Sequence, residues 1–153
     1  MRRKEREITD LKEIEEIITN NIICRIAFSD GKMPYIVAMN YGYQKNKIFL
    51  HSAKEGKKNK IIKDNNQVCF EITDSIEIIK SENACDFETK YRSVIGFGEI
   101  KIINDMERKK EALQVIMYQY TKNKEWNFSE EMISKINVLK IEIKSLSGKK
   151  SGF

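Results

Sequence analysis

The stretch PYIVAMNYGYQKNKIFLHSA, residues 34–53, carries the strongest indication of the fold. Apolar residues at every second position of its first half predict a strand, with Pro34 at an edge where no ladder hydrogen bond is lost. The polar segment QKNK predicts a tight turn, and IFLHSA predicts a second strand. Because a connection this short joins neighbouring strands in opposite directions, the stretch predicts an antiparallel meander.

Four more segments have strand-like patterns. In the longest of them, Gly96 and Gly98 remove side chains from one face, which is typical of a sharp barrel bend or a close backbone approach. The closing segment alternates, with Leu139 on one face and Lys140 on the other. The four segments are IICRIAF (22–28), QVCFEIT (67–73), YRSVIGFGEIKII (91–103) and VLKIEIKSL (138–146).

Three helices are predicted between these strands. Asp10 is a suitable N-cap for an apolar stripe of Leu11, Ile14, Ile17 and Ile18. Ser52 and Glu55 have capping-box spacing, which predicts a short helix from about Ala53 to Asp64. Asp105 precedes the longest helix. We therefore expect a mainly β fold with flanking α-helices: an antiparallel barrel of about six strands with helices packed outside it.

Composition limits the class of protein. The 153 residues are 41% hydrophobic and 33% charged, which fits a single globular domain, residues 1–153, and argues against disorder. No apolar run is long enough for a membrane span, and the charged start predicts no secretory signal, so we expect a cytoplasmic protein. Three widely spaced cysteines and one histidine predict reduced thiols and no metal site.

A lysine-rich segment follows the only histidine, His51. Cations at a helix N-terminus are unfavourable because that end already carries partial positive charge. A bound phosphate would offset this charge by accepting from backbone N–H groups and ammonium groups together. A solvated charge run is the alternative interpretation, and the pattern favours neither. The lysines are Lys54, Lys57, Lys58, Lys60 and Lys63.

Other candidate residues also have two interpretations. His51 stands where a strand leaves the barrel, and it could face a ligand, although a lone histidine is more often structural. The stripe of Tyr35, Tyr41 and Tyr43 is more often sheet core than a cofactor surface. Trp126 could cap a planar ligand or close the core.

Several segments in this order resemble the pyridoxamine 5′-phosphate oxidase-like flavoproteins, most closely the nitroimidazole-resistance (Nim-type) branch. The resemblance extends from about Arg2 to Lys150. Its most specific part is HSAKEGKK followed by YRSVIGFG. The other segments that carry it are YIVAMNYGY, NQVCFEI and ENACDFETKYRSVIGFGEI, with a late Trp and a closing GKK.

The resemblance implies a split β-barrel homodimer that binds FMN at the subunit interface. Lys57 and Lys58 would hold the phosphate, and His51 would lie near the reactive face of the flavin as the catalytic residue. Arg92 and Ser93, from the partner subunit, would line the cleft, and Trp126 would close it. The two predicted strands PYIVAMNYGY and IFLHSA would place six further residues beside the isoalloxazine ring: Val37, Ala38, Met39, Asn40, Ser52 and Ala53.

The resemblance also implies an oxidoreductase, with nitroaromatic compounds as candidate substrates. The arginine-rich segment that grips the substrate phosphate in the oxidases themselves has no counterpart in SLSGKKSGF, which argues against pyridoxamine phosphate as the substrate. One alternative is a flavin binder or redox sensor without turnover. Another is a basic barrel that binds nucleic acid, which the net charge of +5 permits.

Overall fold

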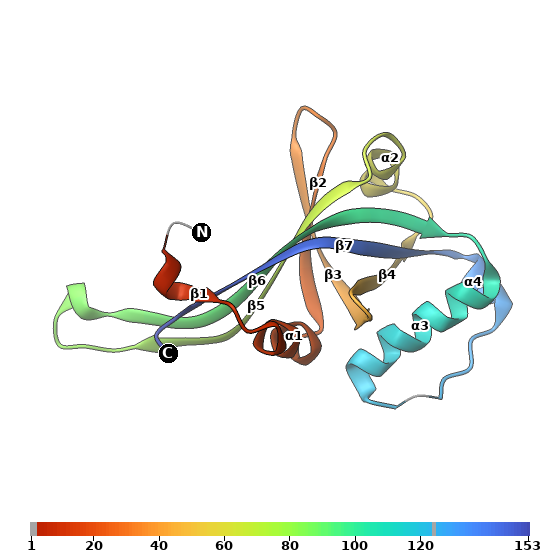
Figure 1. Ribbon diagram of the computed structural model, residues 1–153. Coiled ribbons are helices and arrows are strands. Elements are labelled where there is room, and N and C mark those ends of the chain that lie inside the picture. The colour runs from red at the N-terminus through yellow and green to blue at the C-terminus, as the bar shows by residue number, and fades with distance from the viewer. Residues whose placement is uncertain (1–2, 124) are drawn as a thin grey trace.

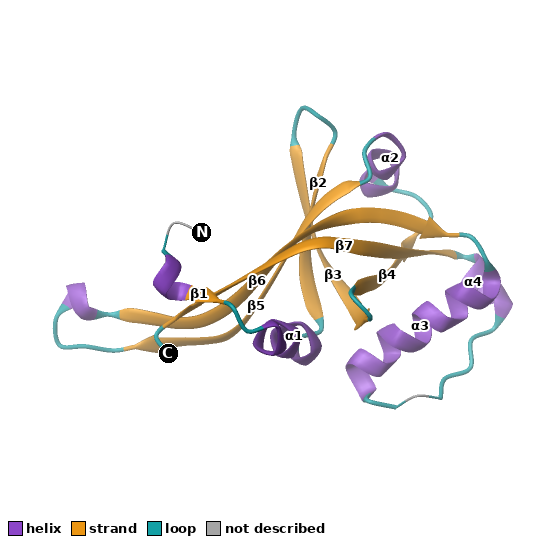
Figure 2. Ribbon diagram, in the orientation of Figure 1, coloured by secondary structure: helices purple, strands orange, loops and turns teal. Residues whose placement is uncertain are grey.

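A computed structural model describes residues 3–123 and 125–153 of the chain. Arg2, where the family resemblance begins, lies outside the described residues. Figures 1 and 2 show a sheet that curls into a barrel, with helices on its outside. The strands are β1 (Glu7–Ile8), β2 (Ile23–Ser29), β3 (Pro34–Gln44), β4 (Lys47–Ala53), β5 (Gln67–Ile79), β6 (Glu88–Ile103) and β7 (Ile136–Ser151). The helices are α1 (Leu11–Asn20), α2 (Lys57–Asp64), α3 (Met106–Thr121) and α4 (Glu130–Ser134), with short 3₁₀ turns at Lys4–Arg6 and Ala84–Asp86.

The described strands form one antiparallel sheet in the order β1-β7-β4-β3-β2-β5-β6. An additional pairing of β7 with β6 closes six of these strands into a barrel, and β1 adds two residues to the edge of β7. The predicted antiparallel barrel of about six strands is therefore confirmed. β5, β6 and β7 are longer than predicted, and β5 and β6 continue into a two-stranded arm that projects from the barrel (Figure 1).

The barrel interior holds the main core, and the predicted tyrosine stripe lies in it. Tyr41 is fully buried, and its hydroxyl donates to the backbone carbonyl of Ile18 in α1. Tyr35 and Tyr43 pack against the same core. The tyrosines of β3 therefore belong to the sheet core and do not form a cofactor surface, as is usual for aromatic residues at alternate positions of a strand.

Helix α1 begins where the sequence predicts. The Asp10 carboxylate accepts a hydrogen bond from the Lys12 backbone N–H at 2.9 Å and caps the helix. Ile14, Ile17 and Ile18 are buried, but Leu11 is 70% exposed. The predicted apolar stripe is therefore wrong at Leu11, because the buried face of the helix begins only at Ile14.

Two glycines permit close backbone contacts. A Cβ on Gly98 would lie 2.4 Å from the carbonyl oxygen of Glu142, beside a register shift between β6 and β7, which confirms the predicted close approach. A Cβ on Gly42 would lie 2.5 Å from the carbonyl oxygen of Val115. Helix α3 therefore packs with its backbone directly against β3. Within the described residues, no helix is long and apolar enough to span a membrane.

Candidate functional site

Strands β3 and β4 separate halfway along their length. They pair only over Tyr41–Gln44 and Lys47–Leu50, whereas β3 pairs with β2 from Pro34 to Asn40. The far end of β4 pairs with β7 alone. We call the opening between residues 34–40 of β3 and 51–53 of β4 the split. Backbone groups of β3 that point into the split have no strand partner among the described residues, so they can receive a ligand.

The side chains beside the split divide between two faces. Ala38 and Asn40 of β3, with His51 and Ala53 of β4, lie on the exposed outer face. Val37, Met39 and Ser52 point the other way, toward the core, with Met39 and Ser52 buried. The outer-face residues can present side chains to a ligand, whereas the core-facing residues can contribute only backbone groups. The small Ala38 and Ala53 leave room for a planar molecule to approach the backbone.

His51 lies at the start of the split. Tyr41 pairs with Leu50, so Asn40 and His51 are the next residues on the two separating strands. The imidazole is exposed and makes no hydrogen bond or ion pair with any described residue. His51 is therefore available to a ligand and is not a hydrogen-bonded core residue.

Helix α2 follows the split directly, and it begins later than the sequence predicts. The predicted capping box is wrong: Ser52 is still in β4, and its hydroxyl donates to the Ala53 carbonyl at 3.1 Å. The N-cap is Gly56, whose φ of 121° few other residues adopt, and Lys57 and Lys58 are the first two helical residues. Lys54 therefore precedes the helix, although it lies within the predicted helix from about Ala53 to Asp64.

No side chain caps the N-terminus of α2, and no acidic residue lies in its first turn. Its backbone N–H groups and two lysines make a cluster of donors. Hydrogen bonds from Met33 and Lys32 chiefly lower the pKa of the nearby Asp30, and the positive charge of Lys57 adds to this effect. The Lys57 ammonium lies over the Tyr35 ring, 5.0 Å from its centre. Lys58 is half-buried and has no ion-pair partner among the described residues. This donor set suits a phosphate group.

Asn59 fixes α2 to the end of β4. Its buried side-chain amide donates to the Ala53 carbonyl at 2.9 Å, and its oxygen accepts from the Asn137 amide at 3.4 Å. Sequence reasoning missed this residue; the signal was a single amide inside a lysine run. It also missed Arg25, which pairs with Ala38 across β2 and β3 and forms an ion pair with Glu71 at 3.0 Å.

Arg92 and Ser93 lie on opposite faces of β6. The Arg92 guanidinium binds both carboxylate oxygens of Asp74, at 3.0 and 2.9 Å, and approaches Glu16 of α1. Its side chain is 14% exposed, and these carboxylates raise its pKa, chiefly through the hydrogen bonds to Asp74. Arg92 therefore ties α1 to the sheet. Ser93 lies on the outer face and lines a hollow of about 290 Å³ with Lys149.

Trp126 lies in the loop that returns along α3 (Figure 1). The side-chain amide of Gln114 donates to the backbone carbonyl of Trp126. It also accepts a hydrogen bond from the backbone N–H of Trp126, at 3.2 Å. The indole is 38% exposed, so it does not close the core as a buried side chain would. Among the described residues, no group of histidine, cysteine, aspartate and glutamate could hold a metal ion.

The split between two barrel strands, with a helix N-terminus beside it, defines a split-barrel class of protein. A family model described as pyridoxamine 5′-phosphate oxidase matches residues 10–150. This chain belongs to that family. No curated protein matches the sequence significantly.

Solved structures agree with this assignment. A protein of Bacteroides thetaiotaomicron, described as a candidate 5-nitroimidazole antibiotic resistance protein, is 31% identical, with a TM-score of 0.85 over 94% of this chain and 86% of its own. The flavocytochrome Anf3 of Azotobacter vinelandii is 15% identical, with a TM-score of 0.86 over 100% of this chain and 72% of its own. An FAD- and heme-binding protein of Mycobacterium smegmatis is 12% identical, with a TM-score of 0.83 over 97% and 74%. The last two show the fold alone.

Proposed function

We propose that this protein is an FMN-binding oxidoreductase that acts as a homodimer and reduces nitroaromatic compounds. The unpaired edge of β3 beside the uncapped N-terminus of α2 is the observation that carries the proposal. A flavin mononucleotide has a planar ring that needs backbone donors and acceptors and a phosphate that needs cations. The split and α2 offer these two kinds of group side by side. The family membership and the relatives described as a flavocytochrome and as an FAD- and heme-binding protein support a flavin ligand.

Each part of the site then has a role. Backbone groups of residues 37–40 bind the edge of the ring, and Ala38 and Ala53 allow it to approach. Lys58, the first-turn N–H groups of α2 and, after a small side-chain movement, Lys57 bind the phosphate. The bound flavin supplies electrons for reduction of the substrate.

His51 is the proposed catalytic residue. It lies on the same outer face as Ala38 and Ala53, with its imidazole exposed to solvent. From this position it donates a proton to an oxygen of the substrate nitro group as that group accepts electrons. Tyr35, the other titratable side chain on β3 or β4 at the split, packs against the core, so His51 is the natural proton donor among the described residues there.

A second copy of the chain would complete the site. Ile36, Ile95 and Phe97 are exposed on the outer face that also carries Ala38 and Ser93. Large exposed apolar side chains gathered on one face are typical of a protein interface. We propose that the partner covers this face and contributes Ser93 and Lys149 to the cleft.

The first test measures FMN affinity by fluorescence titration. Replacement of Lys58 by alanine is expected to weaken binding by more than the ~1 kcal/mol of an exposed ion pair, about fivefold, because it removes the phosphate partner that has no other contact. Lys57→Ala should have a smaller effect, since that ammonium also rests on Tyr35. The matched controls are Lys60→Ala and Lys63→Ala, two exposed lysines farther along α2. Equal effects from all four variants would place the phosphate elsewhere.

The second test follows anaerobic reoxidation of the reduced, FMN-loaded protein by a nitroimidazole. We expect reoxidation by the native protein and a rate roughly 10²-fold lower for His51→Gln, with FMN affinity retained. Absence of reoxidation in the native protein would remove the nitroreductase activity and leave a flavin-binding protein. An unchanged rate in His51→Gln would remove His51 from the catalytic role.

A further inference from the structure

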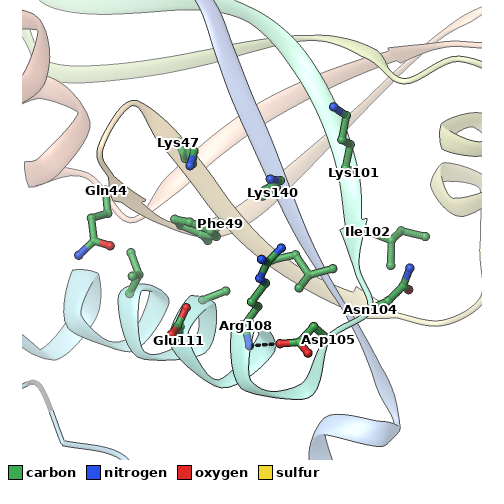
Figure 3. Close-up of a pocket in the computed structure, with 13 residues that line it drawn as sticks. Gln44, Lys47, Phe49, Lys101, Ile102, Asn104, Asp105, Arg108, Glu111 and Lys140 are labelled. Carbon is green, nitrogen blue, oxygen red and sulfur yellow. Dashed lines mark hydrogen bonds between the residues drawn. The ribbon is translucent and has the colours of Figure 1, made fainter.

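A second cavity lies between helix α3 and the outer face of the sheet (Figure 3). Its lining includes Phe49, which lies two residues from His51 on the same face of β4. Its volume is about 700 Å³, within the ~300–1,000 Å³ range of small-molecule sites. β4 contributes Lys47 and Phe49, β7 contributes Lys140, and the first two turns of α3 contribute Arg108. None of the residues proposed above for the flavin lines it.

The cavity combines an apolar floor with a cationic rim. Phe49 is only half-buried, and the apolar residues Ile102 and Val115 also line the cavity. The Arg108 side chain extends from α3 toward Phe49 and Lys140, with Lys47 beyond them (Figure 3). A half-buried aromatic ring beneath convergent cations suits a ligand that has both an apolar body and a negative group.

The rim cations are not all neutralised by the protein. The Lys140 ammonium forms an ion pair with Glu142 at 2.7 Å, and Lys101 approaches the same carboxylate at 3.6 Å. Lys47 and Arg108, in contrast, have no ion-pair partner among residues 3–123 and 125–153. One of the two rim carboxylates, Asp105, is occupied because it caps α3 by accepting from the Arg108 backbone N–H at 2.9 Å. The other rim carboxylate, Glu111, is exposed and forms no ion pair with any described residue, so Lys47 and Arg108 remain for a ligand.

We infer that this cavity binds a small aromatic carboxylate, with its ring on Phe49 and its carboxylate between Arg108 and Lys47. Arginine matches a carboxylate with two parallel N–H donors, and Lys47 adds a second cation from β4, two residues before Phe49. The cavity shares no lining residue with the proposed flavin site, so occupancy of the two sites can be measured separately.

The test uses 2-naphthoate as the probe and the full-length protein with and without bound FMN. In ¹H–¹⁵N NMR spectra, 2-naphthoate should shift the amide resonances of residues 47–49 and 105–112. Arg108→Ala and Lys47→Ala should each weaken binding by about threefold to fivefold, the range expected for a partly exposed ion pair. Lys12→Ala, which removes an exposed lysine of α1, is the matched control and should leave the affinity unchanged.

A probe with the opposite charge distinguishes binding that depends on the carboxylate from nonspecific binding of the aromatic ring. The amine 2-(aminomethyl)naphthalene has the same ring with a positive charge and should not shift these resonances. Equal binding of the amine, resonance shifts confined to the split, or no shifts with millimolar 2-naphthoate would each overturn the inference. Loss of 2-naphthoate binding when FMN is bound would also overturn it, because it would show that the two ligands share one site.

Discussion

Cys24 illustrates how a single buried group affects stability. Its thiol is fully buried in the barrel core, and burial raises its pKa from 9.0 to about 12. The thiol is neutral when protonated, so the folded protein favours the protonated form. Cys69 and Cys85 are less buried, and Cys85 lies exposed near the tip of the arm.

A pH titration of stability tests this effect. An unfolded chain releases the Cys24 proton near pH 9, whereas the folded chain keeps it to about pH 12. The protonated thiol therefore contributes fully to the free energy of unfolding below pH 9. Between pH 9 and about pH 12 this contribution is lost, by up to about 1.4 kcal/mol per pH unit. In urea denaturation, the free energy of unfolding should fall less steeply above pH 9 for Cys24→Ala than for the native protein. Cys85→Ala should keep the native slope, and equal slopes for all three proteins would contradict the burial argument.

At the scale of elements, Arg92 connects helix α1 to the sheet. It binds Asp74 directly across β5 and β6 and also lies near Glu13 and Glu16 of α1. Glu13 in turn binds Lys150 of β7 at 2.9 Å. The network joins three strands and one helix through partly buried charges, where loss of one partner leaves another charge unpaired.

Replacement of Arg92 by alanine is expected to lower the free energy of unfolding by about 2–4 kcal/mol, because Asp74 is then left without its guanidinium. The double variant Arg92→Met with Asp74→Leu should recover most of this loss. Arg25→Ala is the matched control, since Arg25 makes a comparable cross-strand pair with Glu71 but is 57% exposed. That control should cost only ~0–1 kcal/mol. A loss for Arg92→Ala no greater than for Arg25→Ala would mean that the network contributes little.

Local patterns predicted most of the elements. Alternating residues located the strands of the barrel, and Asp10 and Asp105 located the starts of α1 and α3. The start of α2 was predicted wrongly, because Ser52 and Glu55 have the spacing of a capping box while β7 holds residues 51–53 in a strand. The split itself has no local signature: Ala38 and Ala53 look like ordinary strand residues, and only the separation of β3 from β4 makes them border an opening. For Lys57 and His51, the residues alone left a ligand-binding and a structural interpretation open, and the family resemblance favoured the first.

At the scale of the whole molecule, apolar side chains lie on both faces of the sheet: those that fill the barrel interior are buried, but several on the outer face are exposed. Ile36 is 65% exposed and Phe97 is 54% exposed, and both face away from the core on strands that are otherwise well packed. In an isolated subunit these side chains would contact water. A dimer would bury them and would place two splits near one interface.

Introduction of a charge on this face should separate the subunits. Phe97→Glu and Ile36→Glu are expected to change the mass measured by sedimentation equilibrium from that of a dimer to that of a monomer, and to reduce FMN retention. The reason is that a buried, unpaired carboxylate at an interface is costly. Leu11→Glu, which alters an equally exposed residue on α1, should remain dimeric. A monomeric native protein, or dimers of all three variants, would exclude this face as the interface.

The contact at Gly42 links regions that otherwise look separate. β3 carries the proposed ring-binding edge at residues 37–40, and at Gly42 its backbone touches the backbone of α3 with no side chain between them. A displacement of β3 therefore cannot be absorbed by rotation of a side chain at that point, and α3 has to follow. Helix α3 holds the loop of Trp126 through Gln114. We therefore expect a ligand in the split to change the intrinsic fluorescence of the only tryptophan of the chain.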